Sequence, residues 1–354
     1  ASEIYIRSMD ANRTLVAAMA NALGLYSAKP ASGSKPDATT WPANLVLIPV
    51  HTEWQAMDHI ANPDANCPRW DALFGVVHCT PDYRAVQNEA QTVAILEYLN
   101  NNLDKDDKRI NFDNVWAIND GMSIEKFNFS DNFLKWYGFY NDETAAKVRS
   151  LSEKNERFRD GDGVHAFNGI EVGTELLRIR GGPLITDVHN KFEAAIACND
   201  DTASCQASYR SLKYFGLSAH DSSIGAFFST LGMRDELIPT ATPNVSALLV
   251  ELYGDKKGYY FQLLRYSADD GKFSDVTKSV GDCLNTVIVA NANSYCPLEE
   301  FTKFADTYRN DDPEANCADV DETWPTDCQG VPSTAAPAAS TSAPPPVTTT
   351  TTSP

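Results

Sequence analysis

The chain has 354 residues, of which 43% are hydrophobic, so it can bury a substantial core as one large domain with an insertion or as two domains. Its 48 acidic residues outnumber its 29 basic residues and give a net charge of −19. This charge argues against nucleic acid or an anionic membrane surface as a partner, and any anionic ligand must bind at a local cluster of positive charge.

The first part of the chain reads as strands and helices in alternation. Residues 4–6 form a short apolar strand, and the helix after it is expected to end near Gly24. The apolar face of that helix consists of Leu15, Ala18, Met19 and Ala22. The run "NLVLIPVHT" predicts a second strand that ends near His51, and apolar spacing predicts a helix over residues 82–101.

The later part of the chain combines helical patterns with further strands. From Trp116 to about Arg180 the sequence is aromatic and charged with helical spacing, and few strands are expected there. A helix is expected from about Leu184, and an apolar strand runs to Ala219 before another helix. The segment "SALLVELYGDKKGYYFQLLRYS" predicts a hairpin with strands on either side of "GDKKG".

Strands that alternate with helices indicate the α/β class. We expect a mixed, mostly parallel central sheet flanked by helices, with the hairpin as an addition to it. Residues 1–62 and 181–330 would form this core, and residues 63–180 would form an inserted, mainly helical cap. Residues 331–354 are rich in Pro, Ser and Thr and almost lack large apolar side chains, so we expect a disordered tail.

Cysteines and glycosylation signals indicate the secretory pathway. The chain has eight cysteines, an even number, and no C-x-x-C pair of the kind found in zinc and redox sites. Sequons begin at Asn128, Asn244 and Asn12, although Asn12 lies at a predicted helix start, where a glycan would be crowded. Together with the Ser/Thr/Pro-rich tail, these features predict a secreted, lysosomal or cell-surface protein.

Two strand-to-helix junctions carry residues suited to binding phosphate. Arg7 follows the first strand, and His220 and Asp221 follow the strand that ends at Ala219. Ligands of open α/β sheets bind at the carboxyl ends of the strands, so these side chains would share one crevice if their strands are neighbours. A guanidinium and a protonated imidazole bind phosphate oxygens, and a carboxylic acid can protonate a leaving oxygen.

The same junctions also allow structural interpretations. Arg7 could be a solvated or ion-paired residue, and Asp221 could cap the helix that it starts. Asp10 is expected to cap the first helix, and Arg13 is expected to pair with Asp10 on the same helix face. His51 is interpreted as a structural residue.

The sequence resembles a known family in several separate motifs. "IYIRSMDANRT" resembles the R-S-x-D-x-x-R-T element of the histidine acid phosphatases (branch 2 of the histidine phosphatase superfamily), which include the prostatic and lysosomal enzymes. "SAHDSS" resembles the H-D element of that family, and "LVLIPVHT", "NCPRW", "GGPL", "CPLEEF" and "WPTDC" resemble further segments in the same order, so the resemblance covers about residues 4–328. It implies an α/β domain with a helical cap that hydrolyses phosphate monoesters through a phosphohistidine, without metal or cofactor.

The resemblance also implies residue roles and partners. Arg7 matches a phosphate-binding arginine, His220 the phosphate-contacting histidine and Asp221 the proton donor. The expected substrate is a small phosphomonoester or a phosphoprotein, nucleic acid is not expected to bind, and the chain could form a homodimer. The resemblance also implies two disulfides, Cys67 with Cys328 and Cys283 with Cys296. Two more pairs follow by elimination, Cys198 with Cys205 and Cys79 with Cys317.

One element of the family pattern is missing. The family's nucleophile lies in an R-H-G-x-R-x-P element upstream of R-S-x-D, but none of the six histidines here has Arg before it and Gly after it. We therefore expect that the sequence is incomplete at its N-terminus, and that the chain as it stands is close to inactive. The alternative is a catalytically inactive secreted or surface glycoprotein that keeps the fold. A third interpretation, with Ser218 of "GLSAHD" as a nucleophile, lacks the second Gly of G-x-S-x-G and a later histidine.

Overall fold

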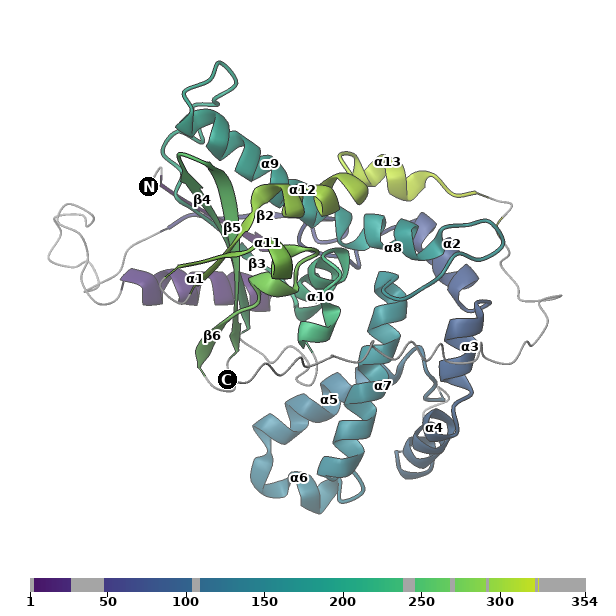
Figure 1. The fold of residues 1–354 in the computed structure, drawn as a ribbon. Helices are drawn as coiled ribbons and strands as arrows, with labels where there is room; N and C mark the ends of the chain where they lie inside the picture. The colour runs from purple at the N-terminus through teal and green to yellow at the C-terminus, as the bar shows by residue number, and fades with distance from the viewer. Residues whose placement is uncertain are drawn as a thin grey trace, which may run out of the picture.

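The computed structural model places the strands on one side of the molecule and a large group of helices on the other (Figure 1). None of the helices that it describes combines the length and the apolar character needed to cross a bilayer. The described residues are 3–26, 48–103, 109–237, 246–267, 271–290, 293–321 and 324.

Three short parallel strands form the first sheet. They are β1 (Ile4–Met9), β2 (Val50–Glu53) and β3 (Tyr214–Ser218). Their order is β2-β1-β3, so β1 is the central strand. Arg7 lies in register with His51 on one neighbour and with Leu217 on the other. The strands that lead to the two predicted junctions are therefore direct neighbours.

Helix α1 (Asn12–Tyr26) packs against this sheet. The buried contact between strand and helix consists of Ile6, Ala18 and Ala22. Met19, which the sequence predicts on the buried face, is instead 56% exposed. The Thr14 hydroxyl is within hydrogen-bond distance of the carbonyl oxygens of Met9 and Ala11, at 2.8 and 2.9 Å. Thr14 is buried, so the face of α1 that carries Thr14 packs against the strand.

The other strands form a separate antiparallel sheet. They are β4 (Ala247–Asp255), β5 (Gly258–Ser267), β6 (Lys272–Asp275), β7 (Ile288–Ala290) and β8 (Asn293–Pro297). Their order is β4-β5-β8-β7, and β6 also pairs with β5. The predicted hairpin is present, but the described residues form two sheets instead of the single, mostly parallel sheet that we predict from the sequence. Because β4 takes one edge of β5 while β6 and β8 share the other, β5 has no edge left for a parallel neighbour.

Helices dominate the segment between β2 and β3. The first helices described in this segment are α2 (Pro68–Val77), α3 (Pro81–Gln87), α4 (Ala90–Asn102), α5 (Val115–Asn128), α6 (Ser130–Trp136), α7 (Asp142–Asp160) and α8 (Val172–Arg180). The single helix predicted over residues 82–101 is in fact two helices, because the chain leaves helical geometry at Asn88 and Glu89. The division of the chain into a core and an inserted cap remains a prediction.

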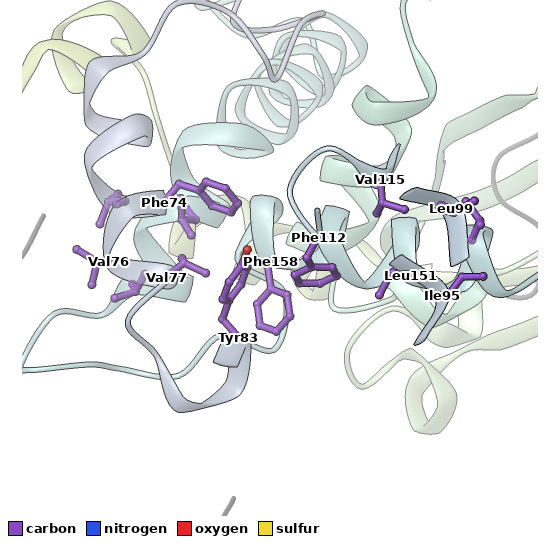
Figure 2. Close-up of a cluster of buried hydrophobic side chains, with 14 of the residues drawn as sticks. Phe74, Val76, Val77, Tyr83, Ile95, Leu99, Phe112, Val115, Leu151 and Phe158 are labelled. Atoms are coloured by element: carbon purple, nitrogen blue, oxygen red, sulfur yellow. The ribbon is translucent and has the colours of Figure 1, made fainter. Parts of the chain in front are cut away.

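These helices enclose one apolar cluster, which Figure 2 shows. Tyr83 lies within it and is 1% exposed. Its ring centroid is 5.2 Å from that of Phe112 and 5.2 Å from that of Phe158. Tyr83 belongs to α3 and Phe158 to α7, while Phe112 precedes α5. Burial of these rings therefore fixes how three parts of the helical segment pack together.

A second cluster joins the antiparallel sheet to four helices, which are α9 (Gly182–Asn199), α10 (Asp221–Thr230), α11 (Cys283–Thr286) and α12 (Leu298–Thr307). The other described elements are η1 (Arg234–Leu237), η2 (Thr277–Ser279) and α13 (Pro313–Ala318), and α13 packs against α2 and α8. Phe227 of α10 and Phe261 of β5 both pack against Phe301 of α12. These rings hold α10 in place, and α10 begins at one of the predicted junctions.

The glycine pair of "GGPL" allows close packing at the start of α9. A Cβ atom at Gly181 would lie 2.5 Å from the carbonyl oxygen of Ala226 in α10. A Cβ atom at Gly182 would lie 2.5 Å from the carbonyl oxygen of Tyr308. No side chain fits at either position, so the pair brings α9 directly against its neighbours.

The disulfides agree with the predictions in part. The structure shows Cys67–Cys317, Cys198–Cys205 and Cys283–Cys296. The last two are the predicted pairs. The predictions of Cys67 with Cys328 and of Cys79 with Cys317 are wrong, because α13 packs against α2 and brings the Cα atoms of Cys67 and Cys317 to 4.6 Å. Cys79 is disulfide-bonded as well, and Cys328 lies outside the described residues.

We expect peptide mapping under non-reducing conditions to recover a peptide pair that joins Cys67 to Cys317. This bond spans 250 residues of sequence, and loss of a native disulfide costs about 2–5 kcal/mol, so the Cys67→Ser, Cys317→Ser variant should unfold at a clearly lower temperature. The Cys198→Ser, Cys205→Ser variant is the control and should lose less stability, because its bond spans 7 residues. A mapped peptide pair that joins Cys67 to Cys328 would refute this assignment.

Candidate functional site

Arg7 lies on β1 and binds two carboxylates. Its Nη2 atom is 2.6 Å from Oε2 of Glu53 and 2.5 Å from Oδ1 of Asp58. The Glu53 side chain is 54% exposed, whereas the Arg7 side chain is 12% exposed and that of Asp58 is fully buried. Glu53 follows His51 by two residues on β2, so it lies on the same face of the sheet as Arg7. Arg7 is thus ion-paired with both carboxylates, and its role in binding phosphate remains a prediction.

His220 and Asp221 lie at the N-terminus of α10. β3 ends at Ser218, and Asp221 is the first residue of the helix. The His220 backbone N–H donates to Oγ of Ser223 at 3.3 Å, and the Ser223 hydroxyl donates to the carbonyl oxygen of Ala61 at 2.6 Å. The free N–H groups of a first helical turn carry partial positive charge, which favours a bound anion at this end of α10.

Arg13 contacts His220, which the sequence does not suggest. Its Nη2 atom is 3.4 Å from Nδ1 and 3.2 Å from Nε2 of the imidazole. This contact replaces the expected structural pair between Arg13 and Asp10. A guanidinium can only donate hydrogen bonds, so a ring nitrogen that accepts from it is unprotonated. Burial lowers the pKa of His220, and the positive charge of Arg13 lowers it further, while Asp221 acts in the opposite direction.

A further carboxylate reaches the site from α5. Burial raises the pKa of Asp120, and the negative charge of Asp221 raises it further, while Arg13 has the opposite effect. Asp120 is therefore within electrostatic range of both residues. No motif marks Asp120 in the sequence, and α5, which carries it, packs against α7.

Other candidate nucleophiles are engaged elsewhere. The Ser218 hydroxyl donates to the carbonyl oxygen of Thr14 at 2.8 Å, so nothing in the site supports the interpretation of Ser218 as a nucleophile. His51 stacks on Tyr5 with ring centroids 4.4 Å apart. The four other histidines contact residues outside the junctions. The contacts are His59 with Cys317, His78 with Asp113, His165 with Asp82, and His189 with Thr302.

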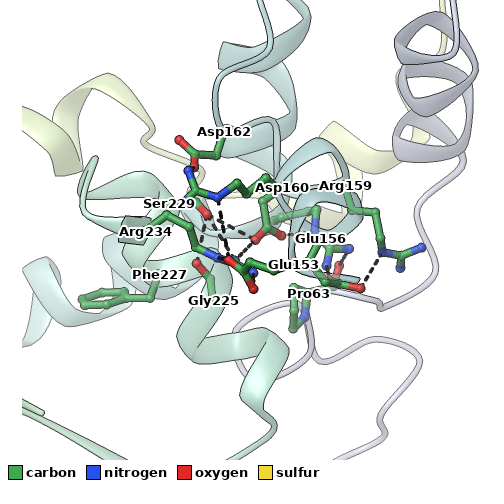
Figure 3. Close-up of polar contacts among 12 residues, drawn as sticks. Pro63, Glu153, Glu156, Arg159, Asp160, Asp162, Gly225, Phe227, Ser229 and Arg234 are labelled. Carbon is green, nitrogen blue, oxygen red and sulfur yellow. Dashed lines mark hydrogen bonds and ion pairs between the residues drawn. The ribbon is translucent and has the colours of Figure 1, made fainter. Parts of the chain in front are cut away.

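A network of buried charges joins α7, α8 and α10 (Figure 3). Asp160, at the end of α7, accepts a hydrogen bond from Nε of Arg180 at 2.6 Å. Its second oxygen accepts from Arg234 and from the Ser229 hydroxyl of α10. The side chains of Asp160 and Arg180 are each 1% exposed. Two buried guanidinium groups thus share one buried carboxylate.

Gly225 of α10 makes room for this network. A Cβ atom at Gly225 would lie 2.5 Å from Nη1 of Arg234. Figure 3 shows both residues beside Asp160. The glycine inside the helical pattern "SSIGAFF" is therefore required by the close approach of a guanidinium, although glycine in a helix interior is itself destabilising.

Asp64 connects the network with the site. Its Oδ1 atom is 2.7 Å from a nitrogen of Arg180 and 2.7 Å from a nitrogen of Arg159. Burial would raise the pKa of Asp64, but the charges and hydrogen bonds of Arg180 and Arg159 outweigh it and lower the pKa. Asp64 is therefore ionised, and its negative charge raises the pKa of His220 and partly offsets the effect of Arg13.

The chemical groups at this edge of the sheet suit an oxyanion. Arg7 and Arg13 supply guanidinium groups, His220 an imidazole and Asp221 a carboxyl group at a helix N-terminus. Guanidinium groups bind phosphate oxygens through paired hydrogen bonds. Within the part of the chain that the structure describes, no group of three or more His, Cys, Asp or Glu side chains could hold a metal ion.

Comparison with known sequences gives a family and several relatives. The family model for the histidine phosphatase superfamily (branch 2) matches residues 1–265. Lysosomal acid phosphatase of Xenopus laevis is 26% identical over 316 residues, which cover 89% of this chain and 63% of that protein. Prostatic acid phosphatase of Homo sapiens is 24% identical over 331 residues, which cover 92% of this chain and 70% of that protein. Putative acid phosphatase 10 of Caenorhabditis elegans is 23% identical over 322 residues, with coverage of 87% and 74%.

Solved structures share the fold at low sequence identity. A phytase of Klebsiella sp ASR1 matches with a TM-score of 0.54 and 13% identity, over 88% of this chain and 78% of that chain. A Hafnia alvei phytase in complex with tartrate matches with a TM-score of 0.54 and 13% identity, over 89% and 80%. These matches establish a phytase-like fold, and at this identity they carry no information about the substrate of this chain.

The substitution Arg13→Gln should raise the pKa of His220, because it removes the positive charge beside the imidazole ring. The pKa is measured by NMR titration of the His220 ring signals. Arg210→Gln is the matched control, because Arg210 is 61% exposed and pairs with Asp201 instead. A His220 pKa that is unchanged or lower in Arg13→Gln would contradict the contact.

The substitution Glu156→Gln should stabilise the fold more near pH 8 than near pH 5. Burial raises the pKa of Glu156 to about 7 from an ordinary value of 4.5, although Arg159 and Arg180 act against it. The folded state therefore holds a proton that the unfolded chain releases, and its stability falls as the pH rises from 4.5 to about 7. Glutamine does not titrate, so the Glu156→Gln variant lacks this loss of stability at high pH. Thermal unfolding at both pH values measures the effect.

The matched control for this experiment is Glu143→Gln. Glu143 is 76% exposed and pairs with Lys147 one turn along α7. Its replacement should change the unfolding temperature little at either pH, because exposed ion pairs contribute little to stability. An equal effect of Glu156→Gln at both pH values would mean that Glu156 does not titrate in this range.

Proposed function

This chain belongs to branch 2 of the histidine phosphatase superfamily, and from that premise we propose that its site recognises the phosphate group of a monoester through Arg7 and His220. The observation that carries the proposal is the direct parallel pairing of β1 with β3. This pairing sets Arg7 in register with Leu217, three residues before His220. Arg13 adds a second guanidinium at the same edge. The two positive charges attract an anion locally, although the net charge of −19 repels it.

Phosphate would raise the pKa of His220. Burial and the charge of Arg13 both lower this pKa. A bound phosphate dianion adds negative charge, which favours the imidazolium. The protonated ring then donates a hydrogen bond to phosphate, while the guanidinium of Arg7 and the N-terminus of α10 bind the other oxygens.

Asp221 is assigned as the donor of the proton to the leaving oxygen. It is the first residue of α10 and follows His220 directly, so a phosphate held by His220 is within reach of its carboxyl group. Asp120 is a second carboxyl group at this place. The charge of Asp221 and burial raise the pKa of Asp120, so Asp120 keeps a proton to a higher pH than an ordinary aspartate does.

Hydrolysis also needs a nucleophile, and this sequence offers none in the family pattern. No histidine of the chain lies between Arg and Gly as in R-H-G-x-R-x-P. We therefore propose that this chain binds phosphate monoesters and turns them over slowly or not at all. Acid phosphatase activity would require the R-H-G-x-R-x-P element of the family in addition to the residues described here. The absence of this element equally favours the alternative, a non-catalytic glycoprotein that recognises phosphate.

We also propose that the protein passes through the secretory pathway. Disulfides form and persist in oxidising compartments, and the described residues contain three complete pairs. Asn128, the last residue of α5, and Asn12, the first residue of α1, are exposed, while Thr14 of the Asn12 sequon is buried. Asn244 lies outside the described residues.

Inorganic phosphate should bind the chain at one site, and Arg7→Ala should weaken binding by at least about tenfold, because charge-assisted hydrogen bonds contribute about 1.5–3 kcal/mol each. Isothermal titration calorimetry measures the dissociation constant. Arg210→Ala is the matched control, since it removes an exposed arginine that is paired with Asp201. Binding that Arg7→Ala leaves unchanged would remove Arg7 from the site and refute the proposal.

Hydrolysis of p-nitrophenyl phosphate by the same chain should stay near the background rate. Turnover that is well above background, and that disappears on replacement of one histidine by glutamine, would identify a nucleophile outside the family pattern. That result would contradict the assignment of this chain as a protein that binds without turnover.

A further inference from the structure

The turn after β2 links the two halves of the proposed phosphate site. Oδ1 of Asp58 accepts hydrogen bonds from Nη2 of Arg7 at 2.5 Å and from the Ala61 backbone N–H at 3.0 Å. The Ala61 carbonyl oxygen accepts from the Ser223 hydroxyl at 2.6 Å, and Ser223 Oγ accepts from the His220 backbone N–H at 3.3 Å. A continuous path of hydrogen bonds therefore runs from the guanidinium of Arg7 to the backbone of His220.

Asp58 cannot leave this position without a large cost. Its side chain is fully buried, and among the described residues its Oδ2 atom has no hydrogen-bond partner. Arg7 supplies the opposite charge that compensates this buried carboxylate. Because an unpaired buried charge is strongly destabilising, Asp58 and Arg7 hold each other in place.

Glu53 differs from Asp58 in its exposure to solvent. Its side chain is 54% exposed and binds the same nitrogen of Arg7 at 2.6 Å. Water can solvate the carboxylate of Glu53 when it leaves, so its departure costs little. Of the two carboxylates that bind Arg7, Asp58 is therefore fixed and Glu53 is exchangeable.

The geometry of a guanidinium decides which carboxylate a phosphate must replace. Arg7 has five N–H donors in one plane, and a bidentate pair uses either Nη1 with Nη2 or Nε with Nη2. Both pairs include a hydrogen of Nη2, and Glu53 and Asp58 occupy that nitrogen. A phosphate that binds in the bidentate mode must therefore displace one of them, and only Glu53 is exposed.

We propose that Asp58 is a positioning residue that fixes the Arg7 guanidinium relative to His220, and that Glu53 is an exchangeable carboxylate that phosphate displaces from Arg7. This inference rests on the proposed function of the site. In this inference, the turn after β2 sets the distance between Arg7 and His220. Glu53 competes with phosphate for Arg7 and thereby lowers the affinity for phosphate.

The variant Glu53→Gln tests the exchange. Inorganic phosphate should bind about two- to fivefold more tightly, because the substitution removes an exposed ionic competitor of modest strength. Glu143→Gln is the matched control: it changes the net charge equally, at an exposed position on α7, and should leave the dissociation constant unchanged. An unchanged or weaker affinity in Glu53→Gln would overturn the role of Glu53.

The variant Asp58→Asn tests the positioning. It keeps the shape of the side chain but removes its charge, so phosphate should bind at least about 30-fold more weakly, as expected when one partner of a buried, hydrogen-bonded charge pair is lost. Asp142→Asn is its matched control, because Asp142 is exposed and pairs with Lys126. A wild-type affinity in a folded Asp58→Asn protein would overturn the role of Asp58.

An NMR measurement separates positioning from a general loss of stability. A held guanidinium rotates slowly, so the Nη hydrogens of Arg7 should give distinct signals in the wild type and in Glu53→Gln. In Asp58→Asn these signals should merge. If Asp58→Asn does not fold, phosphate titration of the wild type gives the test: the Arg7 signals should stay distinct and shift, and merging on phosphate binding would overturn the role of Asp58.

The Arg7→Ala variant distinguishes failure of this inference from failure of the proposed function. If Arg7→Ala leaves phosphate binding unchanged, the site itself is assigned wrongly. If a folded Arg7→Ala protein binds phosphate more weakly but Glu53→Gln does not strengthen binding, the site stands and only the exchange is refuted.

Discussion

The carboxylate of Asp160 holds the guanidinium groups of Arg180 and Arg234 where almost no water reaches them. Each of these charges would cost several kcal/mol if it were buried alone, so none of the three can move without the others. They belong to α7, α8 and η1, and a serine of α10 joins the same carboxylate. The packing of these elements therefore behaves as one unit, and the N-terminus of α10, with His220 and Asp221, is held by it.

The candidate site follows a different electrostatic principle from this network. In the network every guanidinium has fixed carboxylate partners, whereas Arg7 shares its Nη2 atom between the buried Asp58 and the exposed Glu53. Arg13 faces His220, which is not a carboxylate. Positive charge that is not permanently neutralised is what an anion-binding site in an acidic protein requires. The ion pairs of Asp160 thus lie in the interior, whereas at the sheet edge Arg7 is paired with one buried and one exposed carboxylate.

Local patterns in the sequence predicted the elements that carry the site. The strand predicted at residues 4–6 is present but continues through Arg7 to Met9, and the strand before His220 and the helix from Asp221 are present as well. Each of these elements depends on residues that are close in sequence. Contacts over long sequence separations were missed. Arg13 lies 207 positions from His220, so no periodicity could reveal their contact. Apolar spacing predicts Met19 on the buried face of the helix, which is wrong, because this pattern does not register the buried hydroxyl of Thr14.

By itself, the sequence determined the local strands and helices, the family pattern and the chemical groups at the two junctions, because these depend on residue type and short spacing. Only the tertiary structure decided the partners of those groups. It separated the hairpin from the parallel strands, joined Cys67 to Cys317, and placed Asp58 and Glu53 on Arg7. Such partners depend on how distant segments pack and on the free-energy cost of burying an unpaired charge. The spacing of residues along the chain reveals neither of these.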